Sequence, residues 1–148
     1  MKKMVITLIT IMLLIVTSCS NKNLIKNNYI YKGENEFWTA QYKLNATGTF
    51  TKRNDKIHYD GNSNKTLIVK YKNDISQLSS IKHLEISYKS SAGDGKITED
   101  YNNGSPKEKT YTMSSSSTSG IIEDKNEVIK VTINLDGKIQ TIELKNEQ

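Results

Sequence analysis

The C-terminal part of the chain contains a two-residue turn signal that determines how its neighbouring segments pair. Asp136-Gly137 lies between two segments of alternating apolar and polar residues, 127–135 and 138–145. Asp-Gly readily adopts the positive φ angles of a type I′ turn, so the pattern predicts a β-hairpin whose paired residue numbers sum to 273, as 136 and 137 do. This register matches apolar with apolar and polar with polar residues: Val131 with Ile142, Ile129 with Leu144, Thr132 with Thr141, and Lys130 with Glu143. A slip by one residue would set Val131 against Glu143, so the sequence selects a single register.

Alternation with a period of two residues recurs upstream and predicts further strands. The regular segments are 37–44, 66–71 and 83–89, and the weaker ones are 29–31, 96–100 and 109–113. The segment 29–31 is predicted as a short edge strand. Trp38, the single tryptophan, shares a face with Tyr42 and Leu44, so we expect it to fill the core.

Turn-forming residues separate these segments. Clusters of Asn, Asp, Gly and Ser predict turns or corners at 45–48, 53–56 and 60–64. The segment 112–120 is almost entirely Ser and Thr and predicts a low-complexity loop. Between 74 and 80 the apolar residues are spaced by three, so a turn of helix competes with extended chain.

The number and spacing of these elements predict the fold class. About seven to nine short strands with turn signals every eight to twelve residues or so, and no long helical period, are typical of an all-β antiparallel sandwich. An Ig-like arrangement stays open as an architecture, although the Cys…Trp…Cys pattern of Ig domains is absent. Most of the eight tyrosines fall on the apolar phase and are expected in the core. Those in weak strands are candidates for an exposed recognition surface: Tyr29, Tyr31, Tyr101 and Tyr111.

The first twenty residues have the order of a secretory signal. Lys2 and Lys3 precede an apolar run from Met4 to Val16, and small residues then lead to Cys19. The run is shorter than the roughly 20 residues that a membrane-spanning helix needs. We therefore expect a signal-peptide helix in 1–18, a flexible polar tether over 19–28 and a β-sandwich domain over 29–148. The end of the leader resembles the lipobox of bacterial lipoproteins, which implies that Cys19 is lipidated with acyl chains such as palmitate and becomes the first residue of the mature protein.

Several segments of the mature chain carry a wider resemblance. They are Gly33–Trp38, the strand around Tyr88, the Gly93–Gly95 loop and the terminal Val128–Leu144. Together they look like a group of small, uncharacterised lipoproteins of low-GC Gram-positive bacteria, which often have Trp-Asn-Gly where this chain has Leu135-Asp136-Gly137. The group brings no established activity. The resemblance implies an extracytoplasmic protein, lipid-anchored on the outer face of the bacterial cytoplasmic membrane.

Charge and cysteine content limit the possible partners. The leader contains two of the 21 basic residues, so the remaining 130 residues carry 19 basic and 16 acidic side chains. Their small positive excess is scattered, with no block of like charge, and does not suggest a nucleic-acid partner. Cys19 is the single cysteine. Lipidation would consume its thiol and leave no disulfide, so the core alone would have to stabilise the fold.

Residue patterns typical of catalysis are missing from the sequence. His58 and His83 lie on the polar phase of their strands, where we expect outward-facing rings, and no zinc-ligand spacing accompanies them. There is no Gly-x-Ser-x-Gly motif. The carboxylates are expected to be exposed loop residues: Glu34, Glu36, Asp94, Glu99, Asp100, Glu123 and Asp124. We therefore assign no catalytic residue, metal ligand or cofactor, and Cys19 is the one predicted functional residue.

Two classes of function follow. The first is a membrane-anchored, non-enzymatic module that binds a protein or cell-envelope component, with the membrane itself as a partner through the lipid on Cys19. The alternative is a small envelope hydrolase, which would need His58 or His83 to meet a carboxylate in a cleft.

Overall fold

A computed structural model of the chain describes residues 23–53, 56–102, 104–118 and 120–147, with the backbone alone described at Asn23, Arg53 and Tyr59. The predicted signal peptide 1–18, its helix and Cys19 lie outside the described residues. Within the described part of the chain, no helix has the length and apolarity needed to cross a membrane.

The described chain forms antiparallel strands with one short 3₁₀ helix, η1. The elements are β1 (Asn23–Glu34), β2 (Trp38–Arg53), β3 (Lys56–Tyr71), η1 (Ile75–Leu78), β4 (His83–Ser90), β5 (Gly93–Asp100), β6 (Thr110–Thr118), β7 (Ile129–Leu135) and β8 (Lys138–Asn146). The strands follow one another in the order β5-β4-β7-β8-β1-β2-β3-β6. The antiparallel all-β prediction is confirmed.

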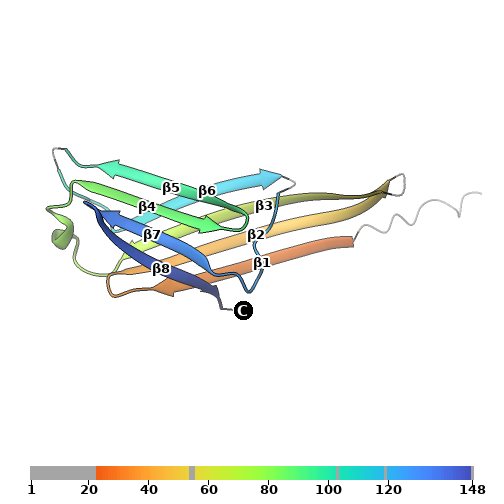
Figure 1. Cartoon of the computed structure of the whole chain (residues 1–148), viewed down its shortest axis with the longest axis horizontal. Coiled ribbons are helices and arrows are strands. Elements are labelled where there is room, and N and C mark those ends of the chain that lie inside the picture. Colours follow the sequence, from red (N-terminus) through yellow and green to blue (C-terminus); the bar gives the residue numbers. More distant parts are fainter. Residues whose placement is uncertain (1–22, 54–55, 103, 119, 148) are drawn as a thin grey trace, which may run out of the picture.

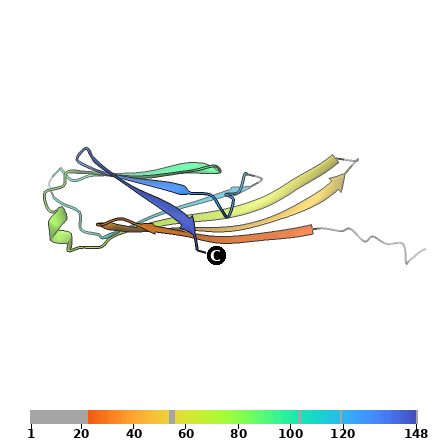
Figure 2. The ribbon, with the colours of Figure 1, turned by 60° about the horizontal axis from the view of Figure 1, so that its bottom comes forward.

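This sheet is folded over into two layers. A long layer contains β1, β2, β3 and β6, and a short layer of β4, β5, β7 and β8 packs against it (Figures 1 and 2). The layers are joined where β1 meets β8, through the pairs Tyr31–Asn146 and Lys32–Lys145. The two layers of the sandwich therefore belong to one continuous sheet, which bends over where β1 pairs with β8.

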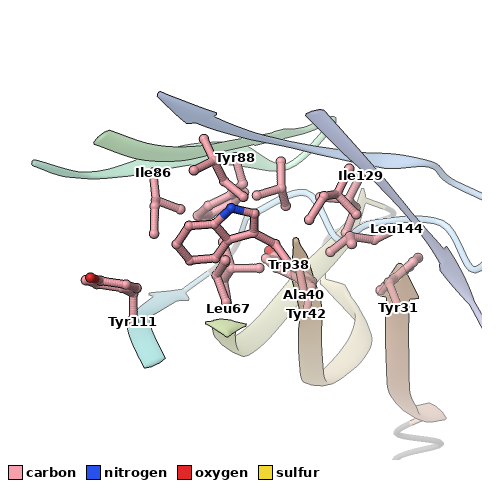
Figure 3. Close-up of a cluster of buried hydrophobic side chains, with 14 of the residues drawn as sticks. Tyr31, Trp38, Ala40, Tyr42, Leu67, Ile86, Tyr88, Tyr111, Ile129 and Leu144 are labelled. Carbon is pink, nitrogen blue, oxygen red and sulfur yellow. The ribbon is translucent and has the colours of Figure 1, made fainter. Parts of the chain in front are cut away.

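The core lies between the two layers, where the apolar side chains of alternate strand positions meet (Figure 3). Trp38 is completely buried, and its ring centroid lies 4.9 Å from that of Tyr71 and 6.2 Å from that of Tyr111. The predicted core role of Trp38 is thus confirmed. Tyr31 and Tyr111, predicted as candidates for an exposed surface, are buried, so that prediction is wrong for both.

The hairpin of β7 and β8 has the predicted register. Val131 pairs with Ile142, and Thr132 pairs with Thr141. Asp136 and Gly137 have φ angles of 49° and 87°, the positive values that the two-residue turn requires. This hairpin was predictable because the turn residues and the alternation agree.

The first strand is longer than predicted. Residues 23–28, predicted as tether, belong to β1, and 29–31 continue a strand that pairs with β2 along its whole length, from Asn23–Phe50 to Glu34–Thr39. Near its C-terminal end, β1 also pairs with β8 on its other side, so it is an interior strand there and not a short edge strand. The ladder satisfies the backbone groups of this Asn-rich stretch whatever its side chains are.

Two predicted turns and one predicted loop are also strand. β2 and β3 continue through 45–48 and 60–64, with Gly48 opposite Gly61, and the chain reverses after Arg53, which pairs with Lys56. β6 continues to Thr118 because it pairs with β3, so most of the Ser/Thr-rich segment is strand. The competition at 74–80 resolves as the helix η1, whose first turn is capped by the Asp74 carboxylate accepting from the Ser76 N–H at 2.8 Å.

The long pairing of β2 with β3 carries the long layer beyond the short one (Figure 2). We call the projecting part the overhang, and it comprises 23–26, 47–53 and 56–62. Among its residues whose side chains are described, Gly48 is the one buried position. The overhang is therefore a largely solvent-exposed extension of an otherwise two-layered fold.

Candidate functional site

The two histidines lie in different layers. His58 is exposed on β3, and His83 is on the outer face of β4, where its Nδ1 lies 2.7 Å from Oδ1 of Asp100 on β5. The side chains of His83 and Asp100 are 37% and 62% exposed, so this pair lies open to solvent. The predicted outward orientation is confirmed for both rings. Among the described residues, no three His, Cys, Asp or Glu side chains are grouped so that they could hold a metal ion.

The most concentrated chemistry is a buried ionic cluster around Glu123, in the segment between β6 and β7. The Tyr42 hydroxyl donates to Glu123 Oε1 at 2.6 Å, and the Ser90 hydroxyl donates to the same oxygen at 2.9 Å. Nζ of Lys65 lies 3.1 Å from it and also donates to the carbonyl oxygen of Ala92 at 2.9 Å. The side chains of Lys65 and Glu123 are 7% and 0% exposed. β2, β3 and β4 thus converge on one carboxylate.

These contacts keep Glu123 ionised despite its burial. Burial alone would raise the pKa of Glu123, but hydrogen bonds from Tyr42, the backbone, Ser90 and Lys65 outweigh it and hold the pKa below the usual range. Burial, followed by the hydrogen bond to Glu123, raises the pKa of Tyr42, so its hydroxyl stays protonated and donates. The cluster is therefore an ion pair with two neutral donors, all of them at Oε1 of Glu123, whereas Oε2 is buried without a hydrogen-bond partner among the described residues.

The cluster holds a segment that we call the strap, residues 120–128. Besides Glu123, the Tyr31 hydroxyl donates to the carbonyl oxygen of Asp124 at 2.8 Å. Farther along, Glu127 accepts from the N–H and the hydroxyl of Ser91 at 2.5 and 2.6 Å. The strap is thereby tied to both layers of the sandwich. The contacts of the cluster thus account for a structural role, which is to hold the strap against the two layers.

Glu123 was predicted to be exposed, and that prediction is wrong. Its partners lie far away in the sequence, Tyr42 by 81 positions and Ser90 by 33, so local composition carries no sign of them. One signal was available. Lys65 shares the inward phase of β3 with Leu67 and Val69, and a lysine on a core face needs a buried anion.

The one residue assigned a function from sequence, Cys19, lies outside the described residues, but the structure describes the strand that follows it. Three residues separate Cys19 from Asn23, the first residue of β1. Four Cα-to-Cα steps span at most about 14 Å. Chain length therefore limits the distance between Cys19 and the overhang end of the long layer, where β1 begins.

Comparison of the chain with protein-family models, with curated proteins and with solved structures gives no match. The leader sequence and the chemistry of the described residues are therefore what bears on its function.

Proposed function

We propose that the protein is an extracytoplasmic lipoprotein, held on the outer face of the bacterial cytoplasmic membrane by lipid on Cys19. Its β-sandwich acts there as a non-catalytic module that binds a protein or cell-envelope component. The observation that carries this proposal is the leader, whose charged start, apolar run and small residues end at Cys19.

The energetics of lipid anchoring support the attachment. A buried acyl chain contributes about 0.8 kcal/mol per CH₂, and one chain gives only marginal membrane binding whereas two give stable anchoring. A diacylglyceryl group on Cys19, as the lipobox resemblance implies, supplies two chains. No second membrane signal is then needed to retain the domain.

The chemistry of the described residues supports a binding module. The buried carboxylate Glu123 is engaged in tying the strap to the sandwich, through Tyr42, Lys65 and Ser90. The His83–Asp100 pair is a solvent-exposed cross-strand contact and not part of an enclosed site. A sandwich held together by such contacts is suited to present a surface to a partner.

Replacing the lipid-accepting thiol tests the attachment. We expect cells that express the wild-type chain and are fed an alkyne-labelled fatty acid to yield a labelled protein in the membrane fraction. Cys19→Ala should lose the label, because alanine cannot form the thioether, whereas Ser18→Ala should keep it. A wild-type chain without label, or a Cys19→Ala chain that retains it, would contradict the proposal.

Crosslinking on intact cells tests the binding role. The lipidated protein should yield reproducible crosslinks to one envelope component, and these should be lost when an unlabelled excess of the same protein competes. A protein that is anchored but crosslinks only at random would leave the attachment standing and refute the binding role.

A further inference from the structure

We propose that the overhang is a membrane-docking surface, which lays an apolar face against a lipid bilayer and places lysines among its anionic headgroups. The docking surface consists of Ile25, Phe50, Ile57 and Lys52, which share the core face of the strands, together with Lys26 and Lys56, which alternation along the strands turns to the opposite face. The inference rests on the proposed attachment through Cys19 and adds an orientation of the folded domain to it.

The apolar part of the docking surface continues the core face of the long layer. Phe50 has the same inward phase as Trp38 and Tyr42 on β2, and the ladder places Ile25 and Ile57 on that face of β1 and β3. Farther along, the short layer covers this face, but in the overhang the side chains of Ile25, Phe50 and Ile57 remain 39%, 40% and 73% exposed. Phe50 lies diagonally from Ile25 on β1 and from Ile57 on β3, which puts it within reach of each of them. Such an exposed apolar cluster marks an interaction site.

The charge of this end is complementary to an anionic bilayer. The sequence there has a formal net charge of +2, from Lys26, Lys52, Arg53 and Lys56 against Asp55 and Asp60. The three lysines of the docking surface are exposed. Apolar side chains flanked by lysines are the combination that binds the interface of anionic membranes.

The chain outside the described residues places a membrane at this end of the molecule. Cys19 would lie within about 14 Å of Asn23, and Asn23 pairs with Phe50. The β2–β3 hairpin continues past that pair by three residues, or about 10 Å. Because β1 and β2 are antiparallel, the hairpin projects from the end at which β1 begins (Figure 1). Anchoring would therefore hold the docking surface at a high effective concentration near the bilayer, where weak contacts suffice.

A fluorescent label at Ile57 tests this orientation. The full chain carrying Ile57→Cys is produced with lipid on Cys19, so that the new cysteine supplies the one reactive thiol, and is labelled with an environment-sensitive dye. It is then reconstituted into vesicles of phosphatidylcholine and phosphatidylglycerol. Ile139→Cys, on β8 in the short layer, is the matched control because Ile139 is 68% exposed and Ile57 is 73% exposed.

We expect a blue shift at Ile57 and quenching by brominated lipids, with no change at Ile139. Lys52→Glu combined with Lys56→Glu should reduce the blue shift, as should omitting phosphatidylglycerol. With lipid on Cys19 confirmed by mass spectrometry, a label at Ile57 that stays in water would overturn the docking and leave the attachment intact. An unlipidated Cys19 would overturn both. If the label at Ile57 is shielded as much in detergent as in vesicles, and the protein has the mass of a dimer, the membrane docking is overturned. The docking surface would then bind a second copy of the chain.

Discussion

At the scale of single residues, Glu123 shows how this fold uses a buried charge. An ionised carboxylate removed from water is costly unless cations and donors surround it. Here Lys65 supplies the cation, and Tyr42 and Ser90 supply donors from two other strands. The cluster therefore makes the position of the strap depend on three strands at once.

Removing only the cation of this cluster should be strongly destabilising. Lys65→Met keeps an unbranched apolar stem, one atom shorter, but leaves the Glu123 carboxylate buried without its counterion, so we expect a loss of about 3–5 kcal/mol in the free energy of unfolding. Adding Glu123→Gln removes the buried charge, so the double variant should lose less than Lys65→Met alone. Urea denaturation measures both, and simple additivity of the two single effects would contradict the coupling.

The pH dependence of stability should report Glu123 directly. Because the folded-state pKa of Glu123 is lowered, its ionised form adds stability above the unfolded pKa of about 4.3, and this contribution is lost as the pH falls through the folded-state value. We therefore expect the melting temperature of the wild type to fall as the pH drops below about 5. Glu123→Gln should reduce that fall, and two curves that stay parallel would contradict the assignment.

At the scale of the elements, the sequence predicts strands best where local signals agree. The β7–β8 hairpin has both alternation and an Asp-Gly turn, and its register is as predicted. β2 and β3 are longer than predicted. Gly48 and Gly61 are typical of turns and were expected to end the strands, but they lie opposite each other within the ladder. Backbone hydrogen bonds to a long partner strand override such local preferences. The burial of Glu123 leaves no sign in its own neighbourhood for a related reason, since its partners are distant in sequence, and the inward phase of Lys65 is the one signal of it.

The junction between the layers depends on a residue without a side chain. A Cβ atom on Gly33 of β1 would lie 2.3 Å from the carbonyl oxygen of Glu143 on β8. Gly33→Ala should therefore force β1 and β8 apart and cost about 1–3 kcal/mol. Gly104→Ala is the control, because a Cβ there meets nothing within 4 Å and the change should stay within about 0.5 kcal/mol. Thermal melts compare the two, and an equally stable Gly33→Ala would show that the junction can relax.

At the scale of the whole molecule, the long layer has two parts with the same ladder but different surroundings. In the sandwich part of β2, Trp38, Tyr42 and Leu44 are buried against the short layer. In the overhang, the ladder between β2 and β3 continues without that cover. Local stability follows the burial of apolar side chains more than the count of backbone hydrogen bonds. The overhang should therefore open without unfolding the rest.

Amide hydrogen exchange should resolve these two parts within one hairpin. In detergent solution, we expect amides of 47–53 and 56–62 to exchange by local opening, and those of 38–46 and 63–71 to exchange only with global unfolding. Uniform protection along β2 and β3 would contradict a separately opening overhang. If the overhang docks as proposed, reconstitution into anionic vesicles should slow exchange in 47–53 and 56–62 and leave β7 and β8 unchanged. Slower exchange in β7 and β8 instead would place the short layer, and not the overhang, against the membrane.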